Sequence, residues 1–490
     1  MKRTPVFRRI FDLRAALAAL GLAFLSSCAV NPATGAHQFT LMTEGQEIQM
    51  GKDADPGIVA SMGLYSDEAL QNYVRALGLE LAARSERPQL SWTFRVLDDP
   101  LINAFALPGG YIYVTRGILA YLDSEAELAG VLGHEIGHVT ARHSVDQISR
   151  AQVAQLGLGV GMILAPELQQ FEGLASSSLG LLFLKFGRDD ERQADELGVR
   201  YMARLGYDPA QLSGVMGMLG QVTSGEGGGV PEWLSTHPNP ANREEAILEM
   251  ADTVQVATQV PRVERKEYID RLDGLIFGEN PREGYFQDAR FYHPGLRFQM
   301  TFPAGWRTAN MRQGVQALSP QEDAVMVLTL SQSADPETGL RSFLAKEGIE
   351  GGGLSAAPVN GLPAASADFL AANGEQRLAG RAVFLRHEGT IYQLLAYGSP
   401  ASWQGNLPGV RQSLASFQPL TDPTYLNVEP ARIRLISVPR AMSLTDFLAR
   451  EGAGERGEDV RLLNRLEGNP TLAAGQVLKV PVGGKLPGGG

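Results

Sequence analysis

The strongest hydrophobic pattern in the chain lies between residues 126 and 143, in the segment AELAGVLGHEIGHVTARH. Four apolar side chains recur there at helical spacing within an arc of about 80°, which predicts a helix with one buried face. They are Leu128, Leu132, Ile136 and Val139. Ser124 and Glu127 have the S-x-x-E spacing of a capping box, so the helix is expected to begin near Ser124. Gly133 and Gly137 each cost about 1 kcal/mol inside a helix, which indicates that another backbone approaches closely.

Helical and alternating spacing of apolar residues predict the elements around this helix. Helical spacing is expected at 65–83, at 186–205 and from Pro240 onward. Alternating apolar and polar residues predict a strand over 91–97 and a second strand after Asn103. The first domain, residues 28–275, is therefore expected to be mainly helical with a small β-sheet.

The pattern changes in the second half of the chain. Alternating strands with a few helices predict a separate α+β domain over 284–421, in which we find no catalytic constellation. His293 and His387 are isolated within it and are expected to be structural or surface residues. A small α/β module is predicted over 431–482, and the Gly-rich segment 483–490 is expected to be a disordered tail.

Two apolar stretches interrupted by Gly and Ser follow the 126–143 helix, at 156–165 and 174–186. Each is shorter than the roughly 20 residues that a membrane-spanning helix needs. A buried helix or a lid over a cleft is the preferred interpretation, and insertion into a membrane is the alternative.

Composition limits the class of protein. The chain has 490 residues, of which 44% are hydrophobic, so it can build several cores, and its length suggests about three domains. The formal net charge is -11, and no basic stripe occurs outside the extreme N-terminus. A nucleic-acid partner is therefore not expected.

The N-terminus has the form of a bacterial export signal. A cationic segment precedes the apolar run AALAALGLAFL, and LSSC follows, ending in Cys28, the single cysteine of the chain. The LSSC segment resembles the lipobox of bacterial lipoproteins, which implies a signal peptide over 1–27 and an acylated Cys28. Ala29 after the cysteine implies the outer membrane. The alternative is an ordinary cleaved signal with an incidental cysteine. A polar tether and an amphipathic helix are expected to follow.

The 126–143 helix carries the pattern HExxH as His134, Glu135 and His138. Residues at i and i+4 lie one turn apart on one face, so both imidazoles can bind the same ion, about 2 Å from each. Glu135 lies beside that ion, where its carboxylate can take a proton from a water molecule that the metal activates. His143 is five residues past His138 and is expected to point away, toward the surface.

A catalytic zinc site needs a third protein ligand besides the two histidines. Glu191 is the candidate, on a separate helix, and Asp195 follows one turn later on the same face. Asp195 can accept a hydrogen bond from the far nitrogen of a liganding histidine, and the small Ala194 lets the two helices approach. For either acidic residue alone, a solvated helix start would be the preferred interpretation.

These motifs resemble a known family. HEIGHV, followed by GRDDERQAD, is similar to the gluzincin metalloendopeptidases that include HtpX, the periplasmic BepA-like proteases and the CAAX prenyl proteases; NAFALPGGYIYVTRG and STHPNPANR match further segments. The resemblance covers about residues 40–265. It implies one zinc ion bound by His134, His138 and Glu191, with Glu135 as general base and acid. It also implies a mainly α-helical zincin-type domain with a small sheet. With the α+β domain and the small α/β module, the expected fold class is multidomain.

The resemblance also implies roles for residues outside the metal ligands. His237 would be a switch that closes onto the metal, and Arg243 would lie near the cleft, where a positive group can stabilise an oxyanion. The alternatives are a loop-capping histidine and a structural ion pair. The strand comprising Asn103, Ala104, Phe105 and Ala106 would be the edge to which an extended substrate adds.

The C-terminal pattern SLTDFLAR, LLNRL and NPTLAAGQVLKVP resembles a LysM peptidoglycan-binding module. It lacks the Gly-Asp before Ser-Leu and inserts GAGERGED. Binding to peptidoglycan is therefore kept as an alternative rather than as the main expectation.

We therefore expect a lipid-anchored periplasmic zinc endopeptidase that cleaves misfolded or misassembled envelope proteins. One alternative is an assembly factor with a mostly closed zinc site, and another is a cell-wall anchoring protein.

Overall fold

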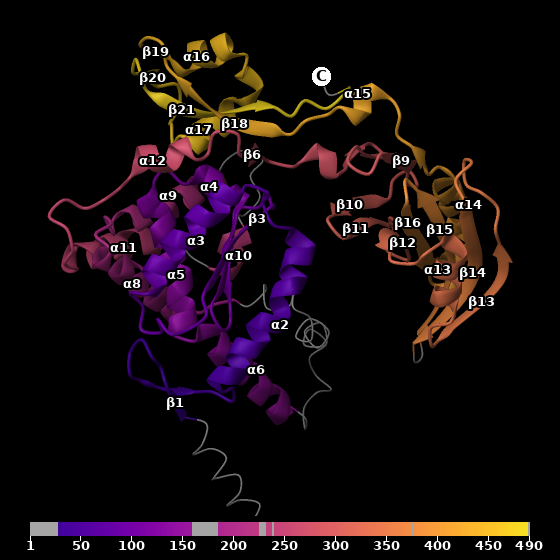
Figure 1. Cartoon of the computed structure of the whole chain (residues 1–490), viewed down its shortest axis with the longest axis horizontal. Coiled ribbons are helices and arrows are strands. Elements are labelled where there is room, and N and C mark those ends of the chain that lie inside the picture. The colour runs from indigo at the N-terminus through magenta and orange to yellow at the C-terminus, as the bar shows by residue number, and fades with distance from the viewer. Residues whose placement is uncertain (1–27, 159–184, 225–231, 238–239, 374–375, 489–490) are drawn as a thin grey trace, which may run out of the picture. The chain divides into compact units, whose positions relative to one another are not determined.

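The computed structural model of the chain describes residues 28–158, 185–224, 232–237, 240–373 and 376–488. Figure 1 shows their helices and strands. Unit 1 comprises the chain up to residue 275 together with 433–481, and unit 2 comprises 276–432 with 482–490. The predicted signal peptide and most of the two apolar stretches after the HExxH helix lie outside the described residues.

The first part of unit 1 is mainly helical, with one small sheet. Its elements are β1 (Cys28–Val30), β2 (His37–Phe39), α2 (Glu44–Met62), α3 (Glu68–Ala82), β3 (Thr93–Leu97), β4 (Ala104–Leu107), β5 (Tyr111–Thr115), α4 (Arg116–Tyr121), α5 (Glu125–Thr140), α6 (His143–Leu158), α8 (Arg188–Arg204), α9 (Gln211–Ser224), α10 (Glu232–Thr236), α11 (Pro240–Thr253) and α12 (Arg265–Asp270). The polar helix predicted to continue from Pro240 instead ends at Thr253, and a separate short helix follows.

Helix α5 begins where its capping residues predict. The Ser124 side chain accepts a hydrogen bond from the backbone N–H of Glu127 at 3.1 Å. Glu127 in turn accepts from the N–H of Asp123 at 2.7 Å rather than from Ser124 itself. The helix is buried along almost its whole length, so it forms the centre of the unit.

The glycines of α5 mark a close contact with α8. A Cβ on Gly133 would lie 3.1 Å from the Cα of Gly198, and one on Gly137 would lie 3.1 Å from the Cα of Ala194. The predicted backbone approach is therefore confirmed. Because the two helices nearly touch, small shifts in either one move the side chains that they bring together.

Three strands lie beside this helix pair. Strands β3 and β5 run parallel, with Thr93 opposite Tyr111, and β4 pairs antiparallel with the other side of β5, with Ala104 opposite Val114. The strand order β3-β5-β4 leaves β4 at the edge of the sheet. Strand β5 continues directly into α4, whose N-cap is Thr115.

The N-terminal segment differs from the tether that the sequence suggests. Strands β1 and β2 form an antiparallel hairpin in which Cys28 is opposite Phe39. The buried side chain of Asn31 donates to the carbonyl of Ala141 at 3.3 Å and to the Gln193 side chain at 3.4 Å. The hairpin is therefore joined to the body of unit 1 through hydrogen bonds that a polar composition alone does not reveal.

Unit 2 is built on a seven-stranded antiparallel sheet in the order β10-β11-β12-β16-β15-β14-β13, beside a four-stranded sheet in the order β17-β9-β8-β7. Its elements are β6 (Ile276–Phe277), β7 (Tyr285–Gln287), β8 (Arg290–His293), β9 (Phe298–Thr301), β10 (Arg307–Met311), β11 (Gly314–Leu318), β12 (Ala324–Ser331), α13 (Pro336–Leu344), β13 (Ile349–Ser355), β14 (Ala364–Asn373), β15 (Gln376–His387), β16 (Thr390–Gly398), α14 (Pro400–Ala415), β17 (Gln418–Pro419) and α15 (Pro423–Leu426). Successive residues of β16 enter opposite cores, since Ile391 packs with α13 and Tyr392 packs with α14.

The C-terminal module has its own small core but belongs to unit 1. Its elements are β18 (Ala431–Ser437), β19 (Met442–Ser443), α16 (Leu444–Glu451), α17 (Gly457–Leu463), β20 (Thr471–Leu472) and β21 (Val477–Gly483). Strands β18 and β21 are neighbours in one sheet, so the chain leaves and re-enters the same sheet around two helices. Whether the module is a LysM domain stays a prediction.

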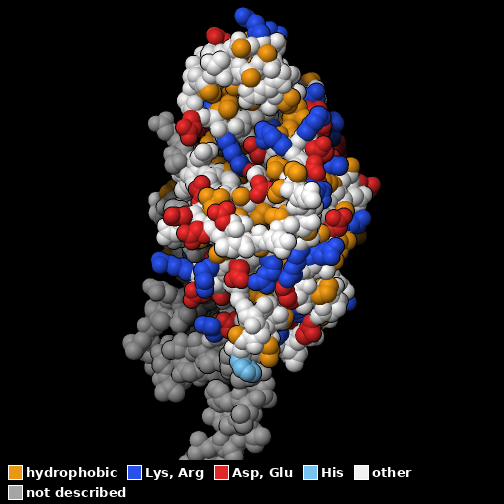
Figure 2. Space-filling view, turned by 90° about the vertical axis from the view of Figure 1, so that its left-hand side faces the viewer, with side chains coloured by type: hydrophobic (Ala, Val, Ile, Leu, Met, Phe, Trp, Pro, Cys, Tyr) orange, Lys and Arg blue, Asp and Glu red, His pale blue; other side chains and the backbone are white. Residues whose placement is uncertain are grey.

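The surface carries both signs of charge. Figure 2 shows Lys and Arg side chains alongside Asp and Glu side chains over one face of the molecule. Among the residues that the structure describes, no helix combines the length and the apolar character needed to cross a bilayer.

Candidate metal centre

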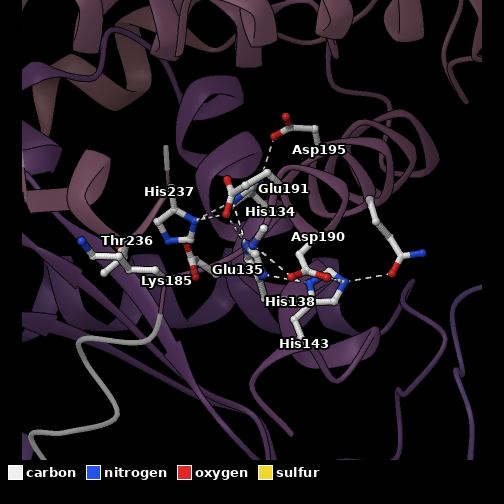
Figure 3. A network of polar contacts seen from close by, with 12 residues as sticks. His134, Glu135, His138, His143, Lys185, Asp190, Glu191, Asp195, Thr236 and His237 are labelled. Atoms are coloured by element: carbon white, nitrogen blue, oxygen red, sulfur yellow. Dashed lines mark hydrogen bonds and ion pairs between the residues drawn. The ribbon is translucent and has the colours of Figure 1, made fainter. Parts of the chain in front are cut away.

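The two histidines of α5 face each other across one turn, as Figure 3 shows. The Nε2 atoms of His134 and His138 are 3.0 Å apart, and both side chains are buried. Two imidazole nitrogens this close share either a proton or a metal ion.

Helix α8 contributes a carboxylate to the same point. Glu191 lies in the first turn of α8, with one oxygen 3.5 Å from Nε2 of His138 and the other 3.6 Å from Nε2 of His134. The predicted separate helix therefore brings Glu191 to the two histidines. It does so because α8 crosses α5 where glycines allow close packing.

His237 completes the group from the end of α10. Its Nδ1 lies 2.8 Å from Oε1 of Glu191 and 3.3 Å from Nε2 of His134. Trp233, one turn earlier, stacks on the His237 ring with ring centroids 4.8 Å apart. The indole and imidazole together cover this side of the group.

The four side chains form a donor set that fits one zinc ion. One donor atom from each of His134, His138, Glu191 and His237 lies within 4.8 Å of the other three, and all four residues are buried. Three imidazoles and a carboxylate are ligands that zinc accepts in four-coordinate sites. With His237 included, all four positions of such a site are supplied by protein.

The protonation states of His138 and Glu191 suit metal binding. Burial and the neighbouring His134 lower the pKa of His138 well below its usual value, so its imidazole is neutral near pH 7. Burial opposes ionisation of Glu191, but His237, His134 and Arg243 outweigh it and hold the pKa of this carboxyl below its usual value. A neutral imidazole and an ionised carboxylate are the forms that coordinate a metal.

Asp195 orients His134 from behind. Its Oδ1 lies 2.9 Å from Nδ1 of His134, and it accepts from Arg243 at 2.6 Å. Burial opposes its ionisation, but Arg243 and His134 outweigh this effect and hold the pKa of Asp195 below its usual value. A carboxylate on Nδ1 keeps the proton there and leaves Nε2 free for a metal.

The guanidinium of Arg243 is engaged by the two acidic residues of α8. It pairs with Glu191 at 2.7 Å and with both oxygens of Asp195 at 2.6 and 2.8 Å. It also lies over the Trp233 ring, 5.1 Å from its centroid. Arg243 is thus ion-paired with both carboxylates, and its action on an oxyanion stays a prediction.

Glu135 stands beside the donor set rather than within it. Its Oε1 lies 3.4 Å from the indole nitrogen of Trp233 and 3.6 Å from Nε2 of His237. Its Oε2 is buried and has no hydrogen-bond partner among the described residues. A buried carboxylate with one unpartnered oxygen next to a metal site is suited to accept a proton.

The expectation that His143 points to the surface was wrong. His143 is buried, and its Nδ1 lies 2.9 Å from Nδ1 of His138. A continuous helix would turn His143 away from His138, but α5 ends at Thr140 and Arg142 adopts a left-handed conformation with φ of 61°. The chain turns there, and α6 begins with His143 against the zinc-site helix.

The predicted edge residues lie along β4 and its approach. Ala104 and Phe105 are buried and Ala106 is partly buried in the edge strand, while Asn103 immediately precedes it. The Oδ1 atom of Asn103 is buried without a hydrogen-bond partner among the described residues. The backbone N–H of Trp233 donates to the carbonyl of Ile102 at 3.3 Å. Helix α10 therefore begins beside this edge.

Sequence reasoning missed Trp233 and Gln193. The side-chain oxygen Oε1 of Gln193 accepts from Nε2 of His143 at 2.9 Å, and Gln193 lies two residues after Glu191. Trp233 lies four residues before His237, a spacing that would place both on one face of a helix. That spacing is the signal that could have identified it.

Known proteins are similar in sequence to the part of the chain that carries this site. Residues 68–251 match Peptidase family M48. Mitochondrial metalloendopeptidase OMA1 of Arabidopsis thaliana is 35% identical over 37% of this chain and 36% of its own length. The beta-barrel assembly-enhancing protease of Escherichia coli (strain K12) is 30% identical over 45% of this chain and 47% of its own length.

A third relative extends over most of its own length. Mitochondrial metalloendopeptidase OMA1 of Schizosaccharomyces pombe is 30% identical over 52% of this chain and 75% of that protein. The chain spans less than half the length of the first two relatives but three quarters of this one. Together with a donor set that could hold a metal ion, these matches show that the chain belongs to peptidase family M48.

Proposed function

We propose that this protein is a zinc-dependent endopeptidase that hydrolyses peptide bonds in misfolded or misassembled proteins of the cell envelope. The observation that carries the proposal is the unpartnered Oε2 of Glu135, buried beside the donor set of His134, His138 and Glu191. The relatives named as endopeptidases and as a beta-barrel assembly-enhancing protease support this reaction and this class of substrate.

Each residue has a defined part in the proposed reaction. When bound, zinc supplies a Lewis acid that activates water and polarises the scissile carbonyl. Glu135 accepts the proton of the attacking water and delivers it to the nitrogen of the leaving amine. Asp195 keeps the proton of His134 on Nδ1, and Arg243 holds the carboxylates of Glu191 and Asp195 in place.

An extended substrate would add to β4 as a further strand, which places its backbone near the HExxH helix. Strand β4 is the edge of its sheet, and edge strands offer unpaired backbone groups to a peptide. The beginning of α10 lies at the same edge, so substrate binding and movement of α10 would be coupled.

The location follows from the N-terminal sequence. A cleaved export signal over 1–27 and an acylated Cys28 would place unit 1 in the periplasm, attached to the outer membrane. Globomycin treatment, which blocks lipoprotein signal cleavage, should increase the apparent mass of the cellular protein. Mass spectrometry of the mature N-terminus would then show acyl chains on Cys28, and an unmodified Cys28 would contradict the anchor.

The decisive test of the enzymatic proposal is the Glu135→Gln variant. It should lose cleavage of casein, since an amide cannot accept the proton, while its zinc content stays equal to that of the wild type. An Asp53→Asn variant, in an exposed position of α2, serves as a matched control and should cleave normally. Cleavage by Glu135→Gln at the wild-type rate would defeat the proposal.

A second candidate function is supported by the position of His237. Because His237 fills the fourth place of the donor set, the protein would act mainly as an outer-membrane assembly or peptidoglycan-associated factor with a latent zinc site. Under this alternative, Glu135→Gln would still rescue the envelope phenotype of a deletion strain, and isolated peptidoglycan would retain the protein.

A further inference from the structure

The C-terminal module contacts the peptidase part of unit 1 through buried charges. The guanidinium of Arg465 donates to both carboxylate oxygens of Glu127, each at 2.7 Å. Glu127 is buried and lies in the first turn of α5. A bidentate pair of this kind fixes the direction of both side chains as well as their separation.

A second cation from the module enters the same region. Lys479 is buried, and its ammonium donates to the carbonyls of Ala120 at 3.0 Å and Leu122 at 2.9 Å. It also pairs with Asp123 at 3.1 Å. Two N–H groups of the ammonium therefore donate to carbonyls of the peptidase part, and Asp123 supplies the opposite charge.

All these acceptors belong to one corner of the peptidase fold. Helix α4 ends at Tyr121, α5 begins after Ser124, and the carbonyls that Lys479 binds are at the end of α4. The last carbonyls of a helix have no partner within it, and a cation is a favourable partner for them. The module therefore caps the end of one helix and the first turn of the next.

The two cations act together because the module joins them. The Asn464 side chain accepts from the backbone N–H of Lys479 at 2.9 Å and donates to its carbonyl at 2.8 Å. Arg465, the next residue, has φ of 52°, a left-handed conformation that a residue with a side chain seldom adopts. This backbone directs Arg465 at Glu127 while Asn464 holds Lys479.

The corner connects the two parts of the proposed active site. On its N-terminal side, β5 runs straight into α4, and β4, the edge strand, pairs with β5. On its C-terminal side, α5 carries His134 and Glu135. The six residues of α4 and this corner directly connect β5, the partner of the edge strand, to the metal-binding helix.

We propose that Arg465 and Lys479 are positioning residues of the peptidase, and that the C-terminal module sets the alignment of edge strand β4 with the metal-binding helix α5. Both residues lie outside the segment 68–251 that matches the family, so the match does not assign them this role. The inference rests on the proposed function, because alignment matters only if a substrate bound along β4 is cut beside α5.

The experiment uses the full chain loaded with zinc and two quenched fluorescent substrates. One is an extended peptide long enough to pair with β4, and the other is a short peptide that covers only the residues next to the cut bond. Arg465→Ala and Lys479→Met should lower kcat/KM for the extended peptide at least about tenfold, with a much smaller loss on the short one and unchanged zinc content. Arg465→Lys, which keeps the charge but not the bidentate contact, should recover part of the loss.

Controls separate positioning from loss of folding. Arg450→Ala removes an exposed arginine of the same module and should behave as the wild type. Amide hydrogen exchange over 120–128 should increase in Arg465→Ala and Arg465→Lys, and exchange in unit 2 should not.

Each outcome decides the inference. The positioning role alone would be overturned if the variants lost equal activity on both peptides. It would also be overturned if Arg465→Ala and a folded Arg465→Lys variant both kept the wild-type kcat/KM for the extended peptide. A wild-type protein that cuts neither peptide, or a fully active Glu135→Gln variant, would instead overturn the proposed function and with it the inference.

Discussion

The Nδ1 atoms of His138 and His143 lie 2.9 Å apart in a buried contact between two imidazoles. Because His138 needs its Nε2 lone pair for a metal, its Nδ1 must carry the proton and donate to His143. His143 then carries its own proton on Nε2 and donates to Oε1 of Gln193 at 2.9 Å. Hydrogen bonds from His138 to His143 and from His143 to Gln193 thus fix the metal-binding tautomer of His138.

Replacement of His143 should therefore weaken zinc binding without removing a ligand. We expect His143→Phe, which keeps a ring but has no acceptor, to lower zinc affinity about 10–100-fold, as for other partners of metal-binding histidines. Competition with a chromophoric chelator measures the affinity. His37→Gln, which changes an exposed histidine, is the control, and an unchanged affinity for His143→Phe would show that His138 needs no such partner.

His237 has two interpretations that its removal distinguishes. If it closes the donor set, His237→Ala frees a position for water, and casein cleavage should increase several-fold. If it stabilises the transition state, the same variant should lose activity. We expect the increase, because Nδ1 of His237 already lies within 2.8 Å of Glu191. The double variant Glu135→Gln/His237→Ala should be inactive, which would show that the gain uses the same base.

Close packing between α5 and α8 predicts an unusual response to alanine. Gly→Ala inside a helix normally stabilises it by about 1 kcal/mol. A Cβ on Gly198 would lie 3.0 Å from the backbone nitrogen of His134, so Gly198→Ala should push α8 and Glu191 away from α5. Zinc affinity and the melting temperature should both fall. Gly220→Ala in α9, where a Cβ meets nothing within 4 Å, should lower neither, and similar behaviour of the two variants would contradict the packing argument.

Unit 2 should lose stability in mild acid because of one histidine. Burial lowers the pKa of His293 to about 4 from 6.5, and its Nδ1 accepts from the N–H of Leu296 at 3.1 Å. Between these two values the unfolded chain binds the proton and the folded chain does not. The free energy of unfolding should therefore decrease as the pH falls from 6.5 toward 4, by up to about 3 kcal/mol.

Hydrogen exchange of β8 and β9 at several pH values would measure this effect within the full chain. His293→Gln, which cannot titrate, should reduce the pH dependence by that amount. If wild type and variant show the same dependence between pH 4 and 6.5, another group is responsible.

The sequence pattern predicted helix α5 and its histidine pair because interactions between residues close in sequence determine both. Ser124 caps α5, the apolar stripe buries it, and the i, i+4 spacing brings His134 and His138 together. Gly133 even indicated the close helix contact, since a glycine there is costly without one.

The remaining features depend on contacts that no periodicity records. His143 lies against His138 because the chain turns at Arg142. Projection of the sequence onto a continuous helix cannot show such a turn. Arg465 lies 338 residues from Glu127, and an ion pair leaves no pattern at such a separation. The N-terminal hairpin was likewise hidden, since its hydrogen bonds join Asn31 to residues far along the chain.

Unit 1 consists of two separate stretches of the chain, so its parts are synthesised at different times. Unit 2 is inserted between residues 275 and 433, so the HExxH helix leaves the ribosome long before Arg465 and Lys479 do. The early chain can form α5 from local contacts, but the corner ahead of it lacks its two cations until the last part of the module has been made. The corner between α4 and α5 thus receives its two cations only after all of unit 2 up to residue 432 has been synthesised.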